Sequence, residues 1–194
     1  MLPDPPVADK LDPRVKRTRG LIQQAFMALL AEKGFRAITV QDITERAEIN
    51  RATFYAHFSD KYALFEYAMR EAFRQELEKR TLNACHYSEE NLRALIVALC
   101  EFVAHLRQQC KASERQFESL AEAQIKKQVQ ELIELWLVQT GATRDPRTAA
   151  TAASWAIYGL AAQWSTAKDR PAVQAYAAQV LPLALANLKA AQPA

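Results

Sequence analysis

The stretch from residue 39 to residue 61, TVQDITERAEINRATFYAHFSDK, carries side chains that could bind nucleic acid. Its apolar residues recur at helical spacing, which predicts that the following side chains face solvent: Arg51, Thr53, Tyr55, His57 and Lys61. A guanidinium can donate two hydrogen bonds to guanine, whereas hydroxyl and ammonium groups can contact phosphate. These groups therefore favour DNA recognition as the chemistry of this stretch.

The stretch is predicted to form two short helices joined by a tight turn. Thr39 can N-cap the first helix, with Asp42 at the position of a capping-box acid. Asn50 can N-cap the second helix, whose outward start and positive dipole end attract phosphate. Arg51 at this start is the best candidate to read a base, and Ala52 beside it lets the backbone approach closely. Two such helices form a helix-turn-helix whose second helix can enter the major groove.

The order of residues in the second helix resembles the signature of the TetR family of transcriptional regulators. The matching residues are Ala52, Thr53, Phe54, Tyr55, Ala56, His57, Phe58 and Lys61. The resemblance covers residues 14–70, and beyond them it rests only on length and helical character. It implies a DNA-binding regulator in which further side chains contact phosphate or the groove walls, namely Thr39, Thr53, Tyr55, His57 and Lys61.

The turn between the two helices departs from the family pattern. The family usually places a glycine there, whereas this chain reads Ala47-Glu48-Ile49-Asn50. We therefore predict that Glu48 adopts a positive φ at some energetic cost. Glu48 also brings a negative charge near the predicted DNA face.

A basic segment precedes the helix-turn-helix. It contains Lys10, Arg14, Lys16, Arg17 and Arg19. Such a segment can touch backbone phosphates, and we include Arg17 among the predicted DNA contacts. The alternative is an ordinary solvated start of a helix. The net charge of the whole chain, +3, is too small to identify a nucleic-acid-binding protein by itself.

Composition and motifs exclude several other classes of protein. The three cysteines, Cys85, Cys100 and Cys110, form no CxxC motif and have no histidines at ligand spacing, so we predict no metal, no cofactor and no disulfide framework. A nucleophile–base pair and a phosphate-binding glycine loop are also missing, which argues against an enzyme. The start of the chain lacks a signal-peptide pattern, and an apolar run long enough to span a membrane is absent. We therefore expect a cytoplasmic protein.

The remaining sequence predicts an all-α fold of about nine helices, with only four glycines in 194 residues. We expect a disordered tail over 1–12, a three-helix DNA-binding domain over 13–60, and an effector-binding and dimerisation domain over 61–194. Pro13 to Lys33 should form the first helix, with Gly34 at its C′ position. Further helices are expected over 60–80, capped by Ser59, and over 88–109, 113–139, 146–167 and 170–190. The helix over 113–139 should be bent near its start, and Pro182 should kink the last helix.

The last two helices are rich in alanine, and small residues let another backbone come close. We predict that they form a four-helix bundle with a second copy of the chain, as in proteins similar to this one. The predicted interface residues are Ala153, Ala156, Gly159, Leu160, Trp164, Val180, Leu181 and Leu185. The alternative is that the same residues belong to the core of a single chain.

The resemblance also implies a small-molecule site among the middle helices. The candidate lining residues are Phe102, His105, Leu106, Trp136, Trp155 and Tyr158. Because most of them are apolar or aromatic, a hydrophobic or aromatic effector is expected. The leading hypothesis is thus a homodimeric repressor that a small effector releases from a palindromic DNA operator. The alternative is an all-α ligand-binding protein that acts through protein contacts, with dispensable DNA-binding heads.

Overall fold

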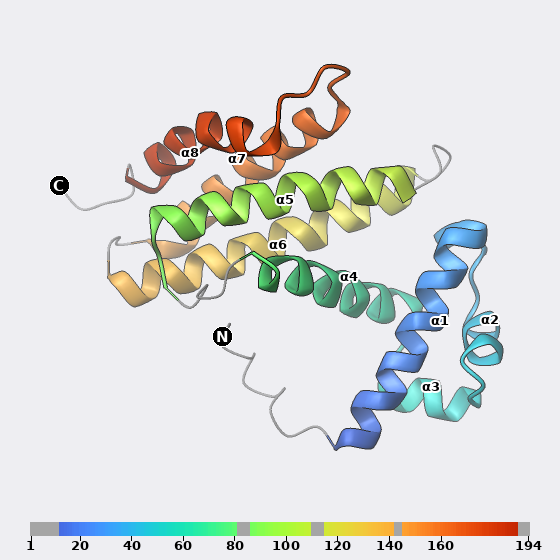
Figure 1. Cartoon of the computed structure of the whole chain (residues 1–194). Coiled ribbons are helices and arrows are strands. Elements are labelled where there is room, and N and C mark those ends of the chain that lie inside the picture. Colours follow the sequence, from blue (N-terminus) through green and yellow to red (C-terminus); the bar gives the residue numbers. More distant parts are fainter. Residues whose placement is uncertain (1–11, 81–85, 110–114, 142–144, 190–194) are drawn as a thin grey trace.

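A computed structural model of the chain describes residues 12–80, 86–109, 115–141 and 145–189. These residues form eight α-helices and no strand (Figure 1). The helices are α1 (Pro13–Ala37), α2 (Val40–Arg46), α3 (Arg51–His57), α4 (Lys61–Glu78), α5 (Glu89–Gln109), α6 (Arg115–Thr140), α7 (Pro146–Thr166) and α8 (Val173–Lys189). The predicted all-α fold is confirmed. Apart from Asp12, the predicted disordered tail lies outside the described residues, as do Cys85 and Cys110.

The predicted count of about nine helices is one too high for this part of the chain. The bend expected near the start of the 113–139 segment does not divide it, because α6 runs as one helix from Arg115 to Thr140. Pro182 also lies inside α8 without ending it. The last helix begins later than predicted, at Val173, and the carbonyl of Pro171 before it accepts a hydrogen bond of 3.0 Å from the Trp164 indole.

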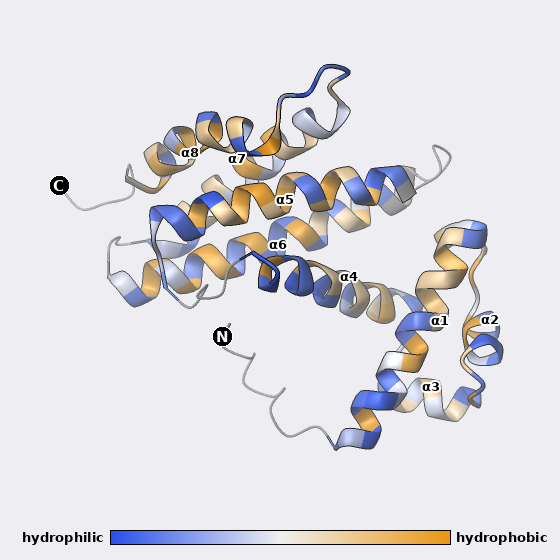
Figure 2. Cartoon of the chain, viewed as in Figure 1, coloured by the Kyte–Doolittle hydropathy of each residue, from blue (hydrophilic) through white to orange (hydrophobic). Residues whose placement is uncertain are grey.

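The helices form two packed units joined by α4. Helices α1, α2 and α3 lie together at one end of the molecule, and α4 leads from them to α5 and α6 (Figure 1). Helix α7 packs on α5 and α6, and α8 covers α5 and α7. In Figure 2, α7 and α8 are coloured mostly apolar, whereas the second half of α4 is mostly hydrophilic.

Each unit has its own hydrophobic core, and α4 contributes to both. Leu64, Phe65, Ala68 and Met69 in its first half pack with α1, α2 and α3. Its second half contributes Phe73 and Leu77 to the core of α5 to α8. The first core also includes Ala121 of α6, which is 1% exposed. The two cores therefore meet along α4 and near the start of α6.

Local sequence signals set the ends of the early helices. Gly34 has φ 77° and ψ 163°, so it ends the regular part of α1 as its sequence position predicts. Helix α4 is capped by Asp60 and not by Ser59, because the Asp60 Oδ1 accepts hydrogen bonds of 2.8 Å from the backbone N–H groups of Tyr62 and Ala63.

Candidate nucleic-acid interface

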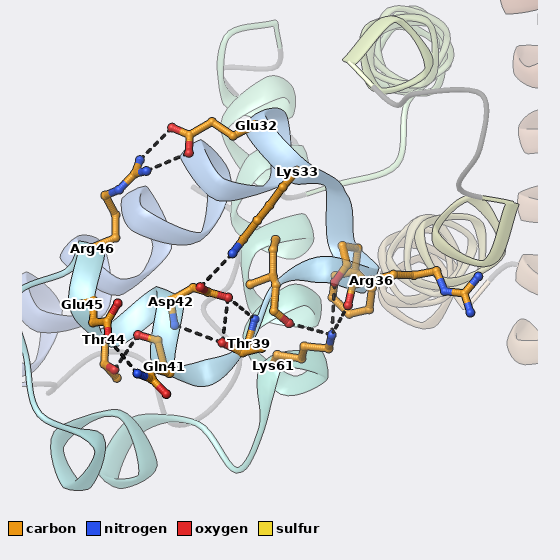
Figure 3. A network of polar contacts seen from close by, with 12 residues as sticks. Glu32, Lys33, Arg36, Thr39, Gln41, Asp42, Thr44, Glu45, Arg46 and Lys61 are labelled. Atoms are coloured by element: carbon orange, nitrogen blue, oxygen red, sulfur yellow. Dashed lines mark hydrogen bonds and ion pairs between the residues drawn. The ribbon is translucent and has the colours of Figure 1, made fainter.

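A capping box holds the start of α2, as the sequence predicts. Thr39 Oγ1 accepts from the Asp42 backbone N–H at 3.1 Å, and Asp42 Oδ2 accepts from the Thr39 backbone N–H at 2.7 Å (Figure 3). Lys33 Nζ lies 2.8 Å from Asp42 Oδ1. The Lys33 ammonium and the Thr39 donors hold the pKa of Asp42 well below its usual range. Helix α2 is thereby fixed to the end of α1.

The turn between α2 and α3 contains the expected backbone strain. Glu48 has φ 55°, the only positive φ of a non-glycine residue in the described part of the chain. The backbone N–H of Ile49 donates to the Thr44 carbonyl at 3.0 Å, which closes the turn. The predicted positive φ of Glu48 is thus confirmed, and the Glu48 side chain is exposed.

Asn50 caps α3, the helix predicted to enter the groove. Its Oδ1 accepts from the Thr53 backbone N–H at 2.7 Å and from the Thr53 hydroxyl at 2.9 Å. Phe54 on the opposite side of α3 is fully buried in the first core. This buried ring and the cap together fix which face of α3 points to solvent.

The outward face of α3 presents Arg51, Ala52 and Tyr55, all of which are exposed. Tyr55 is 55% exposed, which is unusual for a large aromatic side chain. The Arg51 guanidinium donates from Nη2 to Gln41 Oε1 of α2 at 2.9 Å. The predicted outward orientation of Arg51 and Tyr55 is therefore present in the structure.

Lys61 does not point outward. Its ammonium donates to the carbonyls of Phe35, Arg36 and Ile38, at 3.1, 3.3 and 2.8 Å, and lies 4.8 Å from the centre of the Phe35 ring (Figure 3). These carbonyls lie at the C-terminal end of α1, where the regular helical donors run out, and Lys61 adds a donor there beside the Ile38 N–H, which also donates to the Phe35 carbonyl at 3.4 Å. The sequence-based expectation for the direction of Lys61 was therefore wrong.

His57 and the basic lead-in lie beside α3. His57 is half-buried, and burial and the nearby positive charge of Arg19 both lower its pKa. The Arg19 guanidinium lies 5.8 Å from the centre of the Phe58 ring and 5.6 Å from that of Tyr67. Arg17 is exposed on α1. Sequence reasoning missed this packing role of Arg19.

A second candidate site is a small cavity between α5, α6 and α7. Its volume is about 50 Å³, and its lining residues are Val103, Leu106, Arg107, Glu118, Ala121, Glu122 and Tyr158. Two of the six predicted effector residues, Leu106 and Tyr158, are among them. Phe102 and Trp136 belong to the second core, whereas His105 and Trp155 are exposed.

Charged side chains make this cavity more polar than the sequence suggested. Arg107, Glu118 and Glu122 all line it. Burial raises the pKa of Tyr158 to about 12, and the negative charge of Glu122 adds to this effect. Lys126 pairs with Glu122 at 2.7 Å, and its ammonium lies 4.4 Å from the centre of the exposed Trp155 ring. The described residues contain no group of side chains suited to bind a metal ion.

The predicted dimer residues divide between core and surface. Ala153, Trp164, Val180 and Leu181 are buried in the second core of this single chain. The half-buried residues are Ala156, Leu160 and Leu185, and Gly159 is exposed. Two large apolar side chains of α7 and α8 that were not predicted for the interface are exposed, Trp155 at 61% and Leu183 at 54%. The outward faces of α7 and α8 are thus rotated from those the sequence suggested.

No described helix combines the length and the apolar character needed to cross a membrane.

Comparison with known proteins agrees with this geometry. Residues 22–68 match the family model described as bacterial regulatory proteins, tetR family. The HTH-type transcriptional regulator YxbF of Bacillus subtilis is 38% identical over 74 residues, which are 38% of this chain and 20% of YxbF. YdeS of the same organism is 46% identical over 52 residues, 27% of this chain and 26% of YdeS. The chain therefore matches about a quarter or less of the length of these two relatives.

Solved structures extend the likeness to almost the whole chain. A TetR-family regulator from Streptomyces coelicolor has a TM-score of 0.65 at 17% identity and covers 92% of this chain, with 98% of its own length matched. RolR, solved in complex with the ligand resorcinol, has a TM-score of 0.56 at 21% identity, over 93% of this chain and 96% of its own. At such identities the likeness shows the fold.

These relatives are transcriptional regulators and not enzymes, as the sequence predicted. The segment that the family model matches, residues 22–68, contains the helix-turn-helix of α2 and α3. Residues 22–68, which contain the helix-turn-helix, thus match the tetR family of bacterial regulatory proteins, and the described chain shares the all-helical fold of a solved TetR-family regulator.

Proposed function

We propose that the protein is a ligand-responsive repressor that binds a palindromic operator as a homodimer in the cytoplasm. The observation that carries the DNA-binding part is the outward face of α3, where Arg51 and Tyr55 are exposed on a helix fixed by Asn50 and Phe54. Effector binding would shift the population toward dimers whose heads no longer match the operator, by no more than the differential affinity of the effector.

Binding to DNA selected from a random pool tests the DNA face. Arg51→Ala should relax the preference at one base pair by about 1–3 kcal/mol. Tyr55→Ala should weaken binding to all sequences alike. Arg17→Ala should remove one phosphate contact and so reduce the slope of log affinity against log salt concentration by about 0.9 in magnitude. Lys79→Ala, at the far end of α4, is the matched control. Unchanged operator affinity in the three test variants, in gel shifts at several salt concentrations, would contradict the assignment.

The homodimer would use the outward faces of α7 and α8. Trp155 of α7 and Leu183 of α8 are the large exposed apolar side chains there, and Gly159 is exposed about one turn after Trp155 on α7. Leu183→Glu should shift the protein to monomers in sedimentation at micromolar concentration, because it places a charge in an apolar contact. Val138→Glu is the control, since Val138 is also 61% exposed but lies near the end of α6. Equal sedimentation of the two variants would contradict this interface.

The effector would enter the cavity between α5, α6 and α7. RolR is named as a complex with resorcinol, and we propose a similarly compact effector here; the cavity of about 50 Å³ would have to widen around such a ligand. Resorcinol and other small phenols are the first probes to titrate against the operator complex. Leu106→Trp should fill the cavity and abolish release from DNA. The neighbouring exposed residue provides the control His105→Trp, and release that survives in both variants would place the effector elsewhere.

A further inference from the structure

A chain of hydrogen bonds joins three exposed side chains across the helix-turn-helix. Gln41 in the first turn of α2 accepts at Oε1 from Arg51 Nη2, at 2.9 Å. The other end of the same amide donates from Nε2 to Glu45 Oε1, at 2.8 Å. All three side chains are exposed, so packing against a core does not explain why they hold these orientations.

The two bonds of Gln41 leave its amide one favourable orientation. A flipped amide would aim its N–H groups at the Arg51 donors and its oxygen at the Glu45 carboxylate, and both contacts would be repulsive. Glu45 therefore fixes the amide, and the amide holds the Arg51 guanidinium. Because the bond to Gln41 uses only one edge of the guanidinium, other N–H donors of Arg51 remain for a base.

We propose that Gln41 is a positioning residue for base recognition by Arg51, with Glu45 as its anchor. The inference rests on the proposed DNA face. A free arginine side chain populates many rotamers, and ordering it on binding costs free energy. A guanidinium held in place before binding meets the two acceptors of guanine with less of this cost, and it fits the other bases poorly. Gln41 and Glu45 thus sharpen the base preference without contacting DNA themselves.

The test is selection of bound DNA from a random pool, followed by binding measurements on single-base operator variants. Gln41→Met keeps the length of the side chain but removes both hydrogen bonds. It should reduce discrimination about fivefold or more at the operator position that Arg51→Ala affects. Glu45→Ala should act at the same position, whereas Glu45→Gln should keep the wild-type preference because its amide oxygen still accepts from Gln41.

A double variant and a matched control complete the experiment. Arg51→Ala with Gln41→Met should discriminate no less than Arg51→Ala alone, because Gln41 acts only through Arg51. The control is Gln75→Met, since Gln75 makes a similar bond of 3.2 Å to Glu71 on α4, away from α3. Thermal melting should be unchanged in Gln41→Met, whose side chain is exposed.

Three outcomes would overturn the inference. The first is an unchanged base preference in Gln41→Met while the wild type selects a defined sequence, which leaves the proposed DNA face intact. The second is a changed preference at a position that Arg51→Ala does not affect, which would mean that Gln41 reads a base directly. The third is a wild-type protein that selects no sequence, which would also remove the proposed DNA face.

Discussion

At the scale of a single residue, the ammonium of Lys61 has a structural role. It donates to three backbone carbonyls at the end of α1, those of Phe35, Arg36 and Ile38. Lys61→Met should therefore lower the free energy of unfolding by about 1–3 kcal/mol, because three acceptors, two of them in part-buried hydrogen bonds, lose a charged donor. Lys79→Met is the control and should change stability by about 0.5 kcal/mol or less, since Lys79 forms only an exposed ion pair. Equal urea midpoints for the two variants would contradict the role of Lys61.

The carboxyl of Asp42 should make the stability of the fold depend on pH. The pKa of its carboxyl is lower in the folded protein than its usual value, chiefly because Lys33 and Thr39 donate to it. The charged form thus favours folding above the usual Asp pKa, and this contribution is lost as the pH falls through the lower, folded value. The melting temperature of Asp42→Asn should lie below that of the wild type at neutral pH, and the gap should narrow in acid. If the difference between the two melting temperatures stays constant with pH, the lowered pKa of the Asp42 carboxyl is not its cause.

The sequence predicted local features of the site better than distant ones. The caps by Thr39 and Asn50 depend on neighbours within a few residues, so their patterns could be read directly. The positive φ of Glu48 followed from the glycine that the resembled family usually places in this turn. Lys61 binds a carbonyl 26 positions earlier in the chain. Only the packing of α4 against the end of α1 brings these two groups together, and no spacing in the sequence encodes that distance.

At the scale of elements, the turn between α2 and α3 stores strain at Glu48. Glu48→Gly should raise stability by about 1 kcal/mol, because glycine adopts a positive φ without a steric penalty. It should also tighten binding to DNA by removing a negative charge. Glu48→Gln separates the two effects, since it removes the charge and keeps the strain. Equal melting temperatures for the Gly and Gln variants would contradict the strain argument.

The faces of α7 and α8 mark a limit of sequence reasoning at this scale. Alanine occurs on every side of α7, so periodicity alone could not tell which residues face α5 and α6. The structure buries Ala153 and leaves Gly159 exposed on the same helix. Packing against three neighbouring helices decides this orientation, and it also decides which predicted effector residues reach the cavity.

At the scale of the whole molecule, Ala121 lies where the cavity meets the core of the DNA-binding unit. Ala121→Val should overpack this junction, cost about 1–3 kcal/mol of stability and weaken operator binding. Ala123→Val on the exposed side of α6 is the control and should leave both properties unchanged. Calorimetry and gel shifts on the two variants check the expectation, and an operator affinity equal to that of the wild type would speak against coupling through this contact.

Because α4 contributes side chains to both hydrophobic cores, it limits where the chain can be cut into separate fragments. A fragment that stops at residue 60 would keep Phe26, Ile43 and Phe54 but lose the four α4 side chains that cover them. Such a piece would be left with an open apolar surface and could not be expected to stay monomeric or to recognise DNA. The smallest autonomous head should therefore retain α4, because a cut before this helix or within its first half would divide the core of the DNA-binding unit.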